Sequence, residues 1–471
     1  MVYDYAIIGG GVVGSAIFNK FTRLGKKCIL IEKENDVGFG ASKANTALVH
    51  SGVDCKPKTL KAKLNVRGAE LFPSICSRLG VKYVNNGHII VGNDLQKLEE
   101  LKERGKANKV KGLKIIDATR LQKLEPNISK EILFGLYVPT GGIVSSYELA
   151  VAFCEEAIVN GGAVVRAYDI KKIKKQEDYF SLSNLESEFF AKNIINASGS
   201  GYNNIAKLIG SEQYDIVHRR GEYYLLDNSV SDFVTRTIFP LPTKESKGII
   251  VSPTTYGNIL LGPTSEVSDD DRPITTSEGL QKVKEGVSKN FNNIPFNKNI
   301  RVFSGVRSVV GDDFIIEKSK VVSGVINLAG ICSPGLSASP AIAEYVAELE
   351  NINGEEVKTK QRAIYPKLSD LTIEEQDKLI SENPDYGKVI CKCESISLGE
   401  IKNCLYSPLP PLTVDGVKRR TRAGMGRCQG GFCIFAVMEE LSKRFKVDFK
   451  TIEKDAVNSK IIISDIKNGR K

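Results

Sequence analysis

The chain has 471 residues, of which 41% are hydrophobic and 26% charged, with 42 Gly and 17 Pro. This composition excludes a disordered or fibrous protein, and the length suffices for two or three domains of about 150 residues each. Lys and Arg exceed Asp and Glu by 66 − 56 = 10. Because no long basic run or aromatic interleaving accompanies this excess, we expect no nucleic-acid partner. Attraction of small anions or nucleotides and a Lys-rich solvated surface explain the charge equally well.

The first residues lead directly into a strand pattern, without a basic segment or cleavage site before it. No apolar run reaches about 18 residues, the length of a membrane span. We therefore expect a cytoplasmic protein and leave peripheral membrane attachment open. Five of the ten cysteines are scattered and five crowd the C-terminal tail, which is not a disulfide framework and points to a metal in the tail.

The N-terminal residues predict a strand, a helix and a second strand in succession. β-Forming residues occupy Tyr3–Ile8, an apolar-faced helix pattern covers 12–24, and Cys28–Ile31 has the composition of a strand. Similar passages from strand through turn to helix recur at 193–210 and 325–349. The recurrence favours an α/β fold in which one doubly wound, Rossmann-like sheet is revisited.

Two further stretches, 81–138 and 221–303, contain short apolar runs separated by Pro, Gly, Asn and Asp. They predict an antiparallel sheet over the nucleotide-binding domain, and hence a nucleotide-binding region and a substrate region interleaved along the chain. After residue 350 the sequence turns polar and charged before the cysteine-rich tail, as expected for a connector. The predicted boundaries are 1–350 for the main unit (nucleotide-binding region at 1–80, 145–215 and 305–350; substrate region at 81–144 and 216–304), 351–385 for the linker and 386–471 for a small C-terminal domain.

A glycine-rich loop joins the first strand to the first helix. Gly9, Gly11 and Gly14 form G-x-G-x-x-G, whose glycines permit a tight turn, the approach of a pyrophosphate and close packing of helix on strand. Glu32 follows at the end of the second strand, where a carboxylate accepts hydrogen bonds from ribose hydroxyls. These residues predict a bound dinucleotide and leave NAD and FAD open. A second glycine-rich turn before a helix, at 329–336, is either a site for the N1/O2 edge of a reduced flavin or an ordinary turn.

Seven segments spread over the main unit resemble the D-amino-acid-oxidase-like FAD flavoproteins. Within them, the similarity is to the branch of FAD-dependent glycerol-3-phosphate dehydrogenases and L-2-hydroxyglutarate dehydrogenases. The segments are GASKANTALVHSG at 40–52, TLKAKLNVRGAELF at 59–72, PTGGIVSSYEL at 139–149, INASG at 195–199, RRGEYYLL at 219–226, SGVRS at 304–308 and GICSPGLSASPAIA at 330–343. The resemblance implies FAD as cofactor, lying near Gly9, Gly11, Gly14, Glu32, Ser42 and Gly335.

The tail resembles the ferredoxin-like [2Fe-2S] module fused to anaerobic-type glycerol-3-phosphate dehydrogenases, at VICKCESISLGEI and TRAGMGRCQGGFC. This resemblance implies Cys391, Cys393, Cys428 and Cys433 as ligands. A C-x-C pair and a C-x4-C pair, separated by 34 residues, supply four thiolates from two loops, enough for a two-iron cluster. Tetrahedral zinc on the same sulfurs is the alternative. Cys404 is the spare cysteine, and we expect it in the core.

Oxidation of a secondary alcohol requires a base for the hydroxyl proton and a hydride acceptor. Of the three histidines, His50 lies in the segment that runs beside the flavin in the resembling family and is the candidate base; a core or surface histidine is the alternative. An anionic substrate also requires a fixed cation. Arg307 falls where that family carries a substrate-anchoring arginine. Other basic side chains either add charge there or are solvated: His218, Arg219, Arg220 and Lys244.

The substrate is inferred from the combination of modules. The fused iron–sulfur tail favours oxidation of sn-glycerol 3-phosphate to dihydroxyacetone phosphate, with electrons passing through FAD and the cluster to a protein partner or quinone. The anaerobic glycerol-3-phosphate enzymes, however, carry arginines where this chain has Ala44 and Asp54, and Ala47 departs from the hydroxyglutarate branch. The alternatives are L-2-hydroxyglutarate oxidation, an amine or amino-acid oxidase of the same fold, and an electron-transfer subunit. Homo-oligomer formation is left open.

Overall fold

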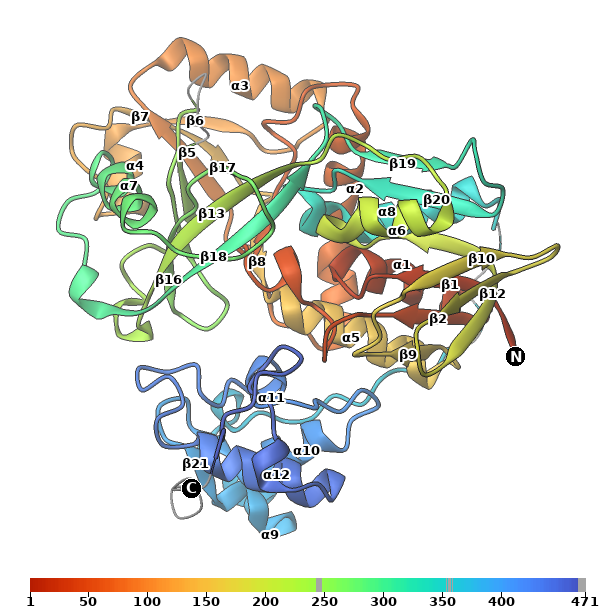
Figure 1. Cartoon of the computed structure of the whole chain (residues 1–471). Coiled ribbons are helices and arrows are strands. Elements are labelled where there is room, and N and C mark those ends of the chain that lie inside the picture. Colours follow the sequence, from red (N-terminus) through yellow and green to blue (C-terminus); the bar gives the residue numbers. More distant parts are fainter. Residues whose placement is uncertain (243–247, 353, 355–356, 358, 465–471) are drawn as a thin grey trace.

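The computed structural model describes residues 1–242, 248–352, 354, 357 and 359–464. Figure 1 shows a larger body built on two sheets and a smaller body, drawn in blue, that holds the C-terminal residues. The helices of the larger body are α1 (Val12–Arg23), α2 (Leu60–Leu79), α3 (Leu95–Ala107), α4 (Ala118–Leu124), α5 (Ser146–Val159), α6 (Tyr202–Ile209), α7 (Ser277–Ser288) and α8 (Gly335–Leu349), with short 3-10 turns η1 (Gly40–Ser42), η2 (Gly199–Gly201), η3 (Asn228–Val230) and η4 (Phe296–Lys298).

The first sheet is mainly parallel and contains the predicted N-terminal unit. Its strand order is β10-β11-β12-β1-β2-β9, with β20 beside β12 and β19 beside β20. Because β1 is parallel to both β2 and β12, Ile8 lies level with Ile31 and Asn196, and these strands end at one edge. The bounds are β1 (Val2–Ile8), β2 (Cys28–Ile31), β9 (Ala163–Val165), β10 (Lys172–Lys175), β11 (Phe180–Ser183), β12 (Glu188–Asn196), β19 (Ile315–Lys318) and β20 (Val325–Ala329).

The predicted strand, helix and second strand are confirmed, with the second strand at the expected residues. Helix α1 contacts α5 and α8, and these three helices pack together against the sheet. Phe18 and Phe21 of α1 are completely buried in this core, together with Ile7 of β1. Burial of such side chains stabilises the fold by roughly 1.5–3 kcal/mol each. The glycine loop is therefore held between two buried elements.

The second sheet forms the substrate region and is mainly antiparallel, as expected. One pair departs from this expectation, because β14 runs parallel to β5. More than a hundred residues separate these two strands, so no tight turn imposes an antiparallel pairing. Helices α3, α4 and α7 pack beside this sheet (Figure 1). Its strands are β5 (His88–Gly92), β6 (Lys114–Asp117), β7 (Phe134–Val138), β13 (Val217–Leu226), β14 (Thr237–Pro240), β15 (Ile250–Pro253), β16 (Ile259–Gly262), β17 (Glu266–Ser268) and β18 (Asn299–Val309).

A small sheet with the order β3-β8-β4 also belongs to the larger body. Its strands are short, and β3 contacts the helix α8. This sheet positions the chain that continues from β3 toward the junction of the two large sheets. Its bounds are β3 (Leu48–Val49), β4 (Tyr83–Val84) and β8 (Gly142–Val144).

The smaller body has its own buried core, which includes Ile401, Val417 and Met438. The residues before it, expected as a linker, contain a helix with a capping box of Thr372 and Glu375. No helix within the described residues is long and apolar enough to cross a membrane. The elements are η5 (Leu368–Asp370), α9 (Ile373–Glu382), η6 (Pro384–Gly387), β21 (Val389–Cys391), β22 (Ile396–Ser397), α10 (Leu398–Leu405), α11 (Val414–Thr421), α12 (Ile434–Phe445) and η7 (Phe449–Thr451).

Candidate functional site

The glycine loop between β1 and α1 accepts only glycine at two positions. Gly9 has φ +104°, and a Cβ atom there would lie 2.6 Å from the carbonyl oxygen of Ala197. A Cβ on Gly14 would lie 2.0 Å from the carbonyl oxygen of Gly9. At Gly11, by contrast, only the Ser42 hydroxyl comes within 4 Å of the added atom. The loop therefore packs tightly on its protein side and leaves room on the other, which fits a pyrophosphate approaching the backbone.

Glu32 lies directly after β2, at the carboxyl edge of the parallel sheet. Its carboxylate accepts hydrogen bonds from the N–H groups of Gly10, at 2.7 Å, and Glu34, at 3.0 Å. Burial raises the pKa of this carboxyl, and the two N–H donors oppose that rise. The donors favour the charged form, which is the form that accepts hydrogen bonds from ribose hydroxyls. Glu32 therefore lies beside the glycine loop, and its role at a ribose site stays a prediction.

Ser42 reaches the start of α1 from a separate segment. Its hydroxyl accepts a hydrogen bond from the N–H of Val12, at 2.9 Å, and Gly11, the residue before α1, has no side chain to do so. Ser42 therefore marks the positive end of α1, where a phosphate is stabilised. Together with the loop and Glu32, it forms a cradle whose chemistry fits a dinucleotide.

His50 follows β3 and lies against the turn that precedes α8. Its backbone N–H donates to the Ser337 hydroxyl at 2.6 Å, and its Nε2 lies 3.4 Å from the Ser333 hydroxyl. Its ring centroid is 5.8 Å from that of Phe239, which belongs to the second sheet. The structure therefore brings together the candidate base, the turn before α8 and the second sheet.

A second histidine, which the sequence did not single out, lies beside the first. His88 is buried, with its ring centroid 5.2 Å from that of Phe239 and its Nε2 3.5 Å from the Ser51 hydroxyl. Burial lowers the pKa of His88 to about 3, and the charge of His50 adds to this effect. His88 is therefore neutral at physiological pH. No local sequence signal identifies it, because its environment is created by distant segments.

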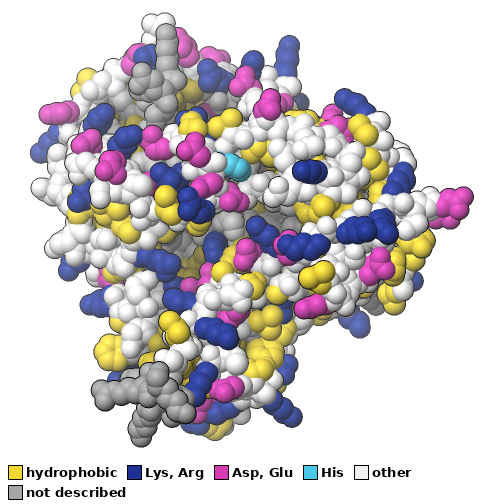
Figure 2. All heavy atoms as spheres, in the orientation of Figure 1, with side chains coloured by type: hydrophobic (Ala, Val, Ile, Leu, Met, Phe, Trp, Pro, Cys, Tyr) yellow, Lys and Arg dark blue, Asp and Glu magenta, His cyan; other side chains and the backbone are white. Residues whose placement is uncertain are grey.

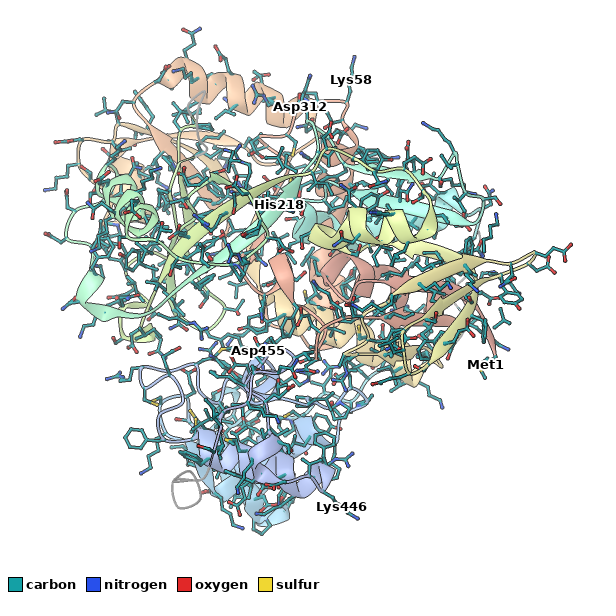
Figure 3. All side chains as sticks on the ribbon, in the orientation of Figure 1. Met1, Lys58, His218, Asp312, Lys446 and Asp455 are labelled. Atoms are coloured by element: carbon teal, nitrogen blue, oxygen red, sulfur yellow. The ribbon has the colours of Figure 1, made fainter. Side chains whose placement is uncertain are left out.

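Arg307 lies on β18 and is paired across the ladder with Arg219 of β13. Both side chains donate to the Ser265 hydroxyl. Arg220 is different, because it projects to the other face and lies 3.5 Å from the buried carboxylate of Glu222. His218 projects to the same side as Arg220, and Figure 3 labels it on β13 in the middle of the view. Lys244 lies outside the described residues.

The four tail cysteines lie on two loops of the smaller body and form two contacting pairs, Cys391 with Cys433 and Cys393 with Cys428. The hydrogen bond from Cys433 lowers the pKa of the Cys391 thiol to about 6. The charge of Cys391 also raises the pKa of Cys393, and the charge of Cys428 raises the pKa of Cys433, so the two pairs influence each other. Among the residues that the structure describes, no three metal-binding side chains are already arranged around one point.

Backbone N–H groups surround these sulfurs. The N–H groups of Gly424 and Glu394 lower the pKa of Cys391, and those of Gly430, Gly431 and Phe432 lower the pKa of Cys428. Four thiols with N–H donors form the donor set that suits an iron–sulfur cluster, since hydrogen bonds to the sulfurs stabilise its negative charge. Cys404 instead packs in the core of the smaller body, where burial raises the pKa of its thiol to about 12. Its expected core position is confirmed.

The smaller body is held on the larger body by ion pairs. Asp36, completely buried beyond β2, pairs with Arg420 of α11, and Lys43, next to Ser42, pairs with Asp455 at 2.7 Å. Figure 3 labels Asp455 at the side of the smaller body that faces the larger one, and Figure 2 shows Lys and Arg side chains along this junction. The segment that carries Ser42 therefore also carries contacts to the cysteine-containing domain.

A third contact leads from the junction to the cysteines. Arg422 pairs with Glu394 at 2.7 Å and donates to Asn258 of the larger body at 3.1 Å. Its guanidinium carbon lies 4.1 Å from the ring centroid of Tyr256. Because Glu394 directly follows Cys393, Arg422 connects the surroundings of the sulfurs with the substrate region.

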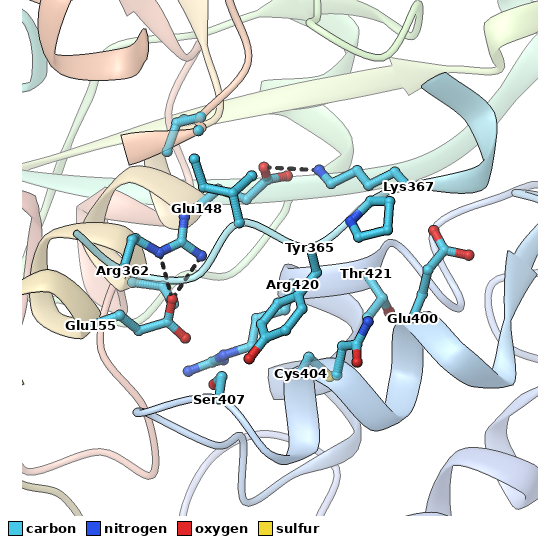
Figure 4. Close-up of a pocket in the computed structure, with 16 residues that line it drawn as sticks. Glu148, Glu155, Arg362, Tyr365, Lys367, Glu400, Cys404, Ser407, Arg420 and Thr421 are labelled. Atoms are coloured by element: carbon cyan, nitrogen blue, oxygen red, sulfur yellow. Dashed lines mark hydrogen bonds and ion pairs between the residues drawn. The ribbon is translucent and has the colours of Figure 1, made fainter. Parts of the chain in front are cut away.

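A cavity of about 100 Å³ lies at the junction, between α5, residues 362–367 and helices α10 and α11 (Figure 4). The close-up shows Arg362 paired with Glu155 and Lys367 paired with Glu148. None of the predicted site residues lines this cavity. The cavity therefore lies between the two bodies and is separate from the residues around His50.

Comparisons with known proteins match the larger and the smaller body to two different families. Residues 4–349 match the family model "FAD dependent oxidoreductase", and residues 389–443 match "BFD-like [2Fe-2S] binding domain". The chain is 38% identical to the glycerol 3-phosphate dehydrogenase of Caloramator mitchellensis, over 99% of both chains. It is 31% identical to the mitochondrial L-2-hydroxyglutarate dehydrogenase of Caenorhabditis elegans, over 56% of this chain and 63% of the relative.

A solved structure extends the likeness to three dimensions. The dithionite-reduced L-alpha-glycerophosphate oxidase from Mycoplasma pneumoniae with FAD bound superimposes with a TM-score of 0.71 at 27% identity. The match covers 78% of this chain and 97% of the oxidase. The likeness therefore spans nearly the whole oxidase.

Proposed function

The chain belongs to the FAD dependent oxidoreductase family, and we propose that it oxidises the C2 hydroxyl of sn-glycerol 3-phosphate, giving dihydroxyacetone phosphate. The observation that carries this proposal is the similarity to a glycerol 3-phosphate dehydrogenase over 99% of both chains. That similarity includes both the FAD unit and the [2Fe-2S] domain. The L-2-hydroxyglutarate dehydrogenase of Caenorhabditis elegans aligns with 56% of this chain, and that of Arabidopsis thaliana aligns with 73% at 25% identity. These relatives therefore support the other substrate less well.

The cradle of Gly9, Gly11, Gly14 and Glu32 would hold the adenosine and pyrophosphate of FAD, with Ser42 at the start of α1. Gly335 opens α8, whose positive end suits the electron-rich edge of a flavin. When bound, FAD supplies the hydride acceptor. The tight packing at Gly9 and Gly14, with space at Gly11, supports this assignment.

His50 would act on the substrate hydroxyl. We propose that its imidazole accepts the hydroxyl proton while the carbinol hydrogen leaves as hydride, since a neutral imidazole is a suitable base near neutral pH. Ser333, within 3.4 Å of Nε2, orients the ring. The buried neighbour His88 stays neutral, so no second positive charge on that ring opposes protonation of His50. Arg307 would bind the anionic end of the substrate.

The four cysteines Cys391, Cys393, Cys428 and Cys433 would hold the [2Fe-2S] cluster. When bound, the cluster supplies a one-electron carrier. The contacts of Arg422 and Asp36 support electron transfer between the two domains, because they hold the cysteine loops against the larger body. The final acceptor that we propose is a protein partner or a quinone.

The test is flavin bleaching by candidate substrates, on holoprotein purified without oxygen. Glycerol 3-phosphate should reduce the flavin rapidly, with cluster reduction following. Fast bleaching by L-2-hydroxyglutarate alone would reverse the substrate assignment, and bleaching by sarcosine or proline alone would identify an amine or amino-acid oxidase. A colourless, metal-free protein that does not take up flavin would contradict the whole proposal.

A further inference from the structure

Two arginines face each other across the longest strand pair of the described residues. Arg219 of β13 lies directly opposite Arg307 of β18 in the antiparallel ladder. Residues in such positions project to the same face of a sheet, and like charges placed there repel. The arrangement is therefore unfavourable unless something else compensates for the two charges.

Both guanidinium groups converge on one serine. Arg219 Nε lies 3.0 Å from the Ser265 hydroxyl, and Arg307 Nη2 lies 3.1 Å from the same oxygen. Arg219 also donates to the Ser265 carbonyl at 2.9 Å, and Arg307 lies 3.4 Å from the Thr264 carbonyl. Neutral oxygens thus orient both groups without cancelling their charge.

No carboxylate within the described residues forms an ion pair with either arginine. This distinguishes the pair from Arg220, which pairs with Glu222, and from Arg420, which pairs with Asp36. Two half-buried positive charges held close together in this way attract an anion, since the repulsion between them is relieved when it binds.

The pair lies on the face of the sheet that packs against the segment leading to His50. Tyr223, on the same face of β13, has its hydroxyl 3.3 Å from the Thr46 hydroxyl. On β18, a Cβ added to Gly305 would lie 1.9 Å from the carbonyl oxygen of Ala44. Gly305 is two residues from Arg307 and projects to the same face, so both arginines lie on the face of the sheet that meets residues 44–46 and not on its outer surface.

The charge and shape of the pair indicate the ligand. A phosphate monoester carries about −1.5 to −2 charges at pH 7 and three acceptor oxygens, whereas a carboxylate carries one charge and two oxygens. Two guanidinium groups match a phosphate monoester better than a carboxylate, because each guanidinium binds oxyanions through two N–H donors. We propose that Arg219 and Arg307 together bind the phosphate of the substrate, with Arg219 as the residue that selects phosphate over carboxylate. This rests on the proposed function and extends it from one arginine to two.

The test compares Arg219→Met with wild-type holoprotein in anaerobic flavin reduction. The half-saturating concentration of glycerol 3-phosphate should rise about 10- to 100-fold, the size expected for loss of a hydrogen-bonded charge contact. The limiting rate should change little, because the contact exists before and during reaction. For glycerol, which has no phosphate, the half-saturating concentration should not change. Arg301→Met removes an exposed arginine from β18, the strand that carries Arg307 and pairs with β13, and is the charge-matched control.

A second readout does not depend on turnover. Calorimetry with inorganic phosphate should show binding to the wild type and to Arg301→Met, and about 10- to 100-fold weaker binding to Arg219→Met. If Arg219→Met folds poorly, as judged by flavin content and thermal unfolding, Arg219→Lys keeps the charge and should bind phosphate with intermediate strength. Unchanged phosphate binding in the folded variant, or equal losses with glycerol and glycerol 3-phosphate, would overturn the proposal. If the wild type binds phosphate at Arg219 but its flavin is not reduced by glycerol 3-phosphate, the proposed function fails and the phosphate site stands.

Discussion

The carboxylate of Asp36 and the guanidinium of Arg420 form a two-point ion pair, with Nη1–Oδ2 at 2.6 Å and Nη2–Oδ1 at 2.9 Å, although the residues are 384 positions apart. Arg419 and Arg166 lie 3.5 and 3.6 Å from the same carboxylate. Asp36 follows Glu32, the proposed ribose-binding residue, by four positions. The domain with the cysteines is therefore fastened to the loop that borders the proposed FAD site.

Replacing Asp36 by Asn should weaken this attachment. Removing one partner of a buried ion pair costs about 3–5 kcal/mol, because the other charge stays buried without compensation. We expect faster proteolysis between residues 359 and 368, and slower cluster reduction after glycerol 3-phosphate is added, while flavin reduction keeps its rate. Rapid mixing with visible absorbance would follow both steps.

The matched control is Lys82→Met. Lys82 and Asp370 form an ion pair at 3.8 Å between the larger body and the segment before the smaller one, and both side chains are about half exposed. Exposed pairs contribute about 0–1 kcal/mol, so neither proteolysis nor cluster reduction should change. Equal effects of both substitutions would show that the burial of Asp36 has no special role.

His50→Asn should slow flavin reduction about 10²- to 10⁴-fold, the range for loss of a general base. FAD content should stay normal, since the dinucleotide cradle does not include this side chain. His218→Asn serves as the control, because His218 projects to the side of β13 that carries Arg220. Stopped-flow reduction over a pH series measures both variants. Retention of the wild-type rate and pH profile by His50→Asn would remove His50 from the mechanism.

Stability should depend on pH through His88. Its pKa in the folded protein is about 3, below its ordinary value of 6.5, owing to burial and to His50, with Asp54 opposing. The unfolded chain therefore binds a proton that the folded chain does not. The contribution of His88 to the free energy of unfolding is complete above about pH 6.5 and declines as the pH falls toward 3. Between about pH 8 and about pH 5.5, the free energy of unfolding should fall by about 1 kcal/mol through this effect.

Chemical unfolding of wild type and His88→Gln across this pH range measures the effect. The variant should be less stable at high pH, since its side chain packs less well against Phe239, but it should lose the extra decline at low pH. If the free energy of unfolding depends on pH in the same way in both proteins, the assignment of a neutral, buried His88 is contradicted.

Gly14→Ala should abolish FAD binding or folding, because the added methyl would lie 2.0 Å from the carbonyl oxygen of Gly9. Overpacking of this kind typically costs about 1–3 kcal/mol and shifts the backbone. Gly201→Ala is the control, since the nearest atom to its added methyl is 3.9 Å away. Flavin per chain after purification is the measurement. A fully flavinated Gly14→Ala protein would show that the loop adjusts more than its packing indicates.

Cys391→Ser should remove the iron and the visible absorbance of the cluster, whereas Cys404→Ala should keep both. The reason is that Cys391 belongs to one of the two cysteine pairs, whereas Cys404 packs in the core of the smaller body. Iron and zinc analysis with absorbance spectra distinguishes the variants. Zinc in place of iron in anaerobically purified protein would contradict the cluster assignment, as would loss of iron from Cys404→Ala.

Much of the fold follows from local sequence patterns. The glycine loop between the first strand and helix requires Gly14 because of a contact with Gly9, and it requires Gly9 because of a contact with Ala197, directly after β12. The four cysteines are likewise recognisable, since two short loops supply all of them. In both cases the informative residues are close together along the chain.

The adjacent residues Arg219 and Arg220 show where sequence reasoning stops. Their order in the sequence does not say which of the two shares a face of the sheet with Arg307. That depends on the register of β13 with β18, because a shift of one residue would exchange the two faces. His88 acquires its low pKa only from burial among distant segments, and Asp36 acquires Arg420 only when the two domains dock. Short-range patterns thus determined the elements and the cofactor-binding motifs, whereas the tertiary structure decided which charges meet, because side-chain direction and burial depend on contacts between residues far apart in the chain.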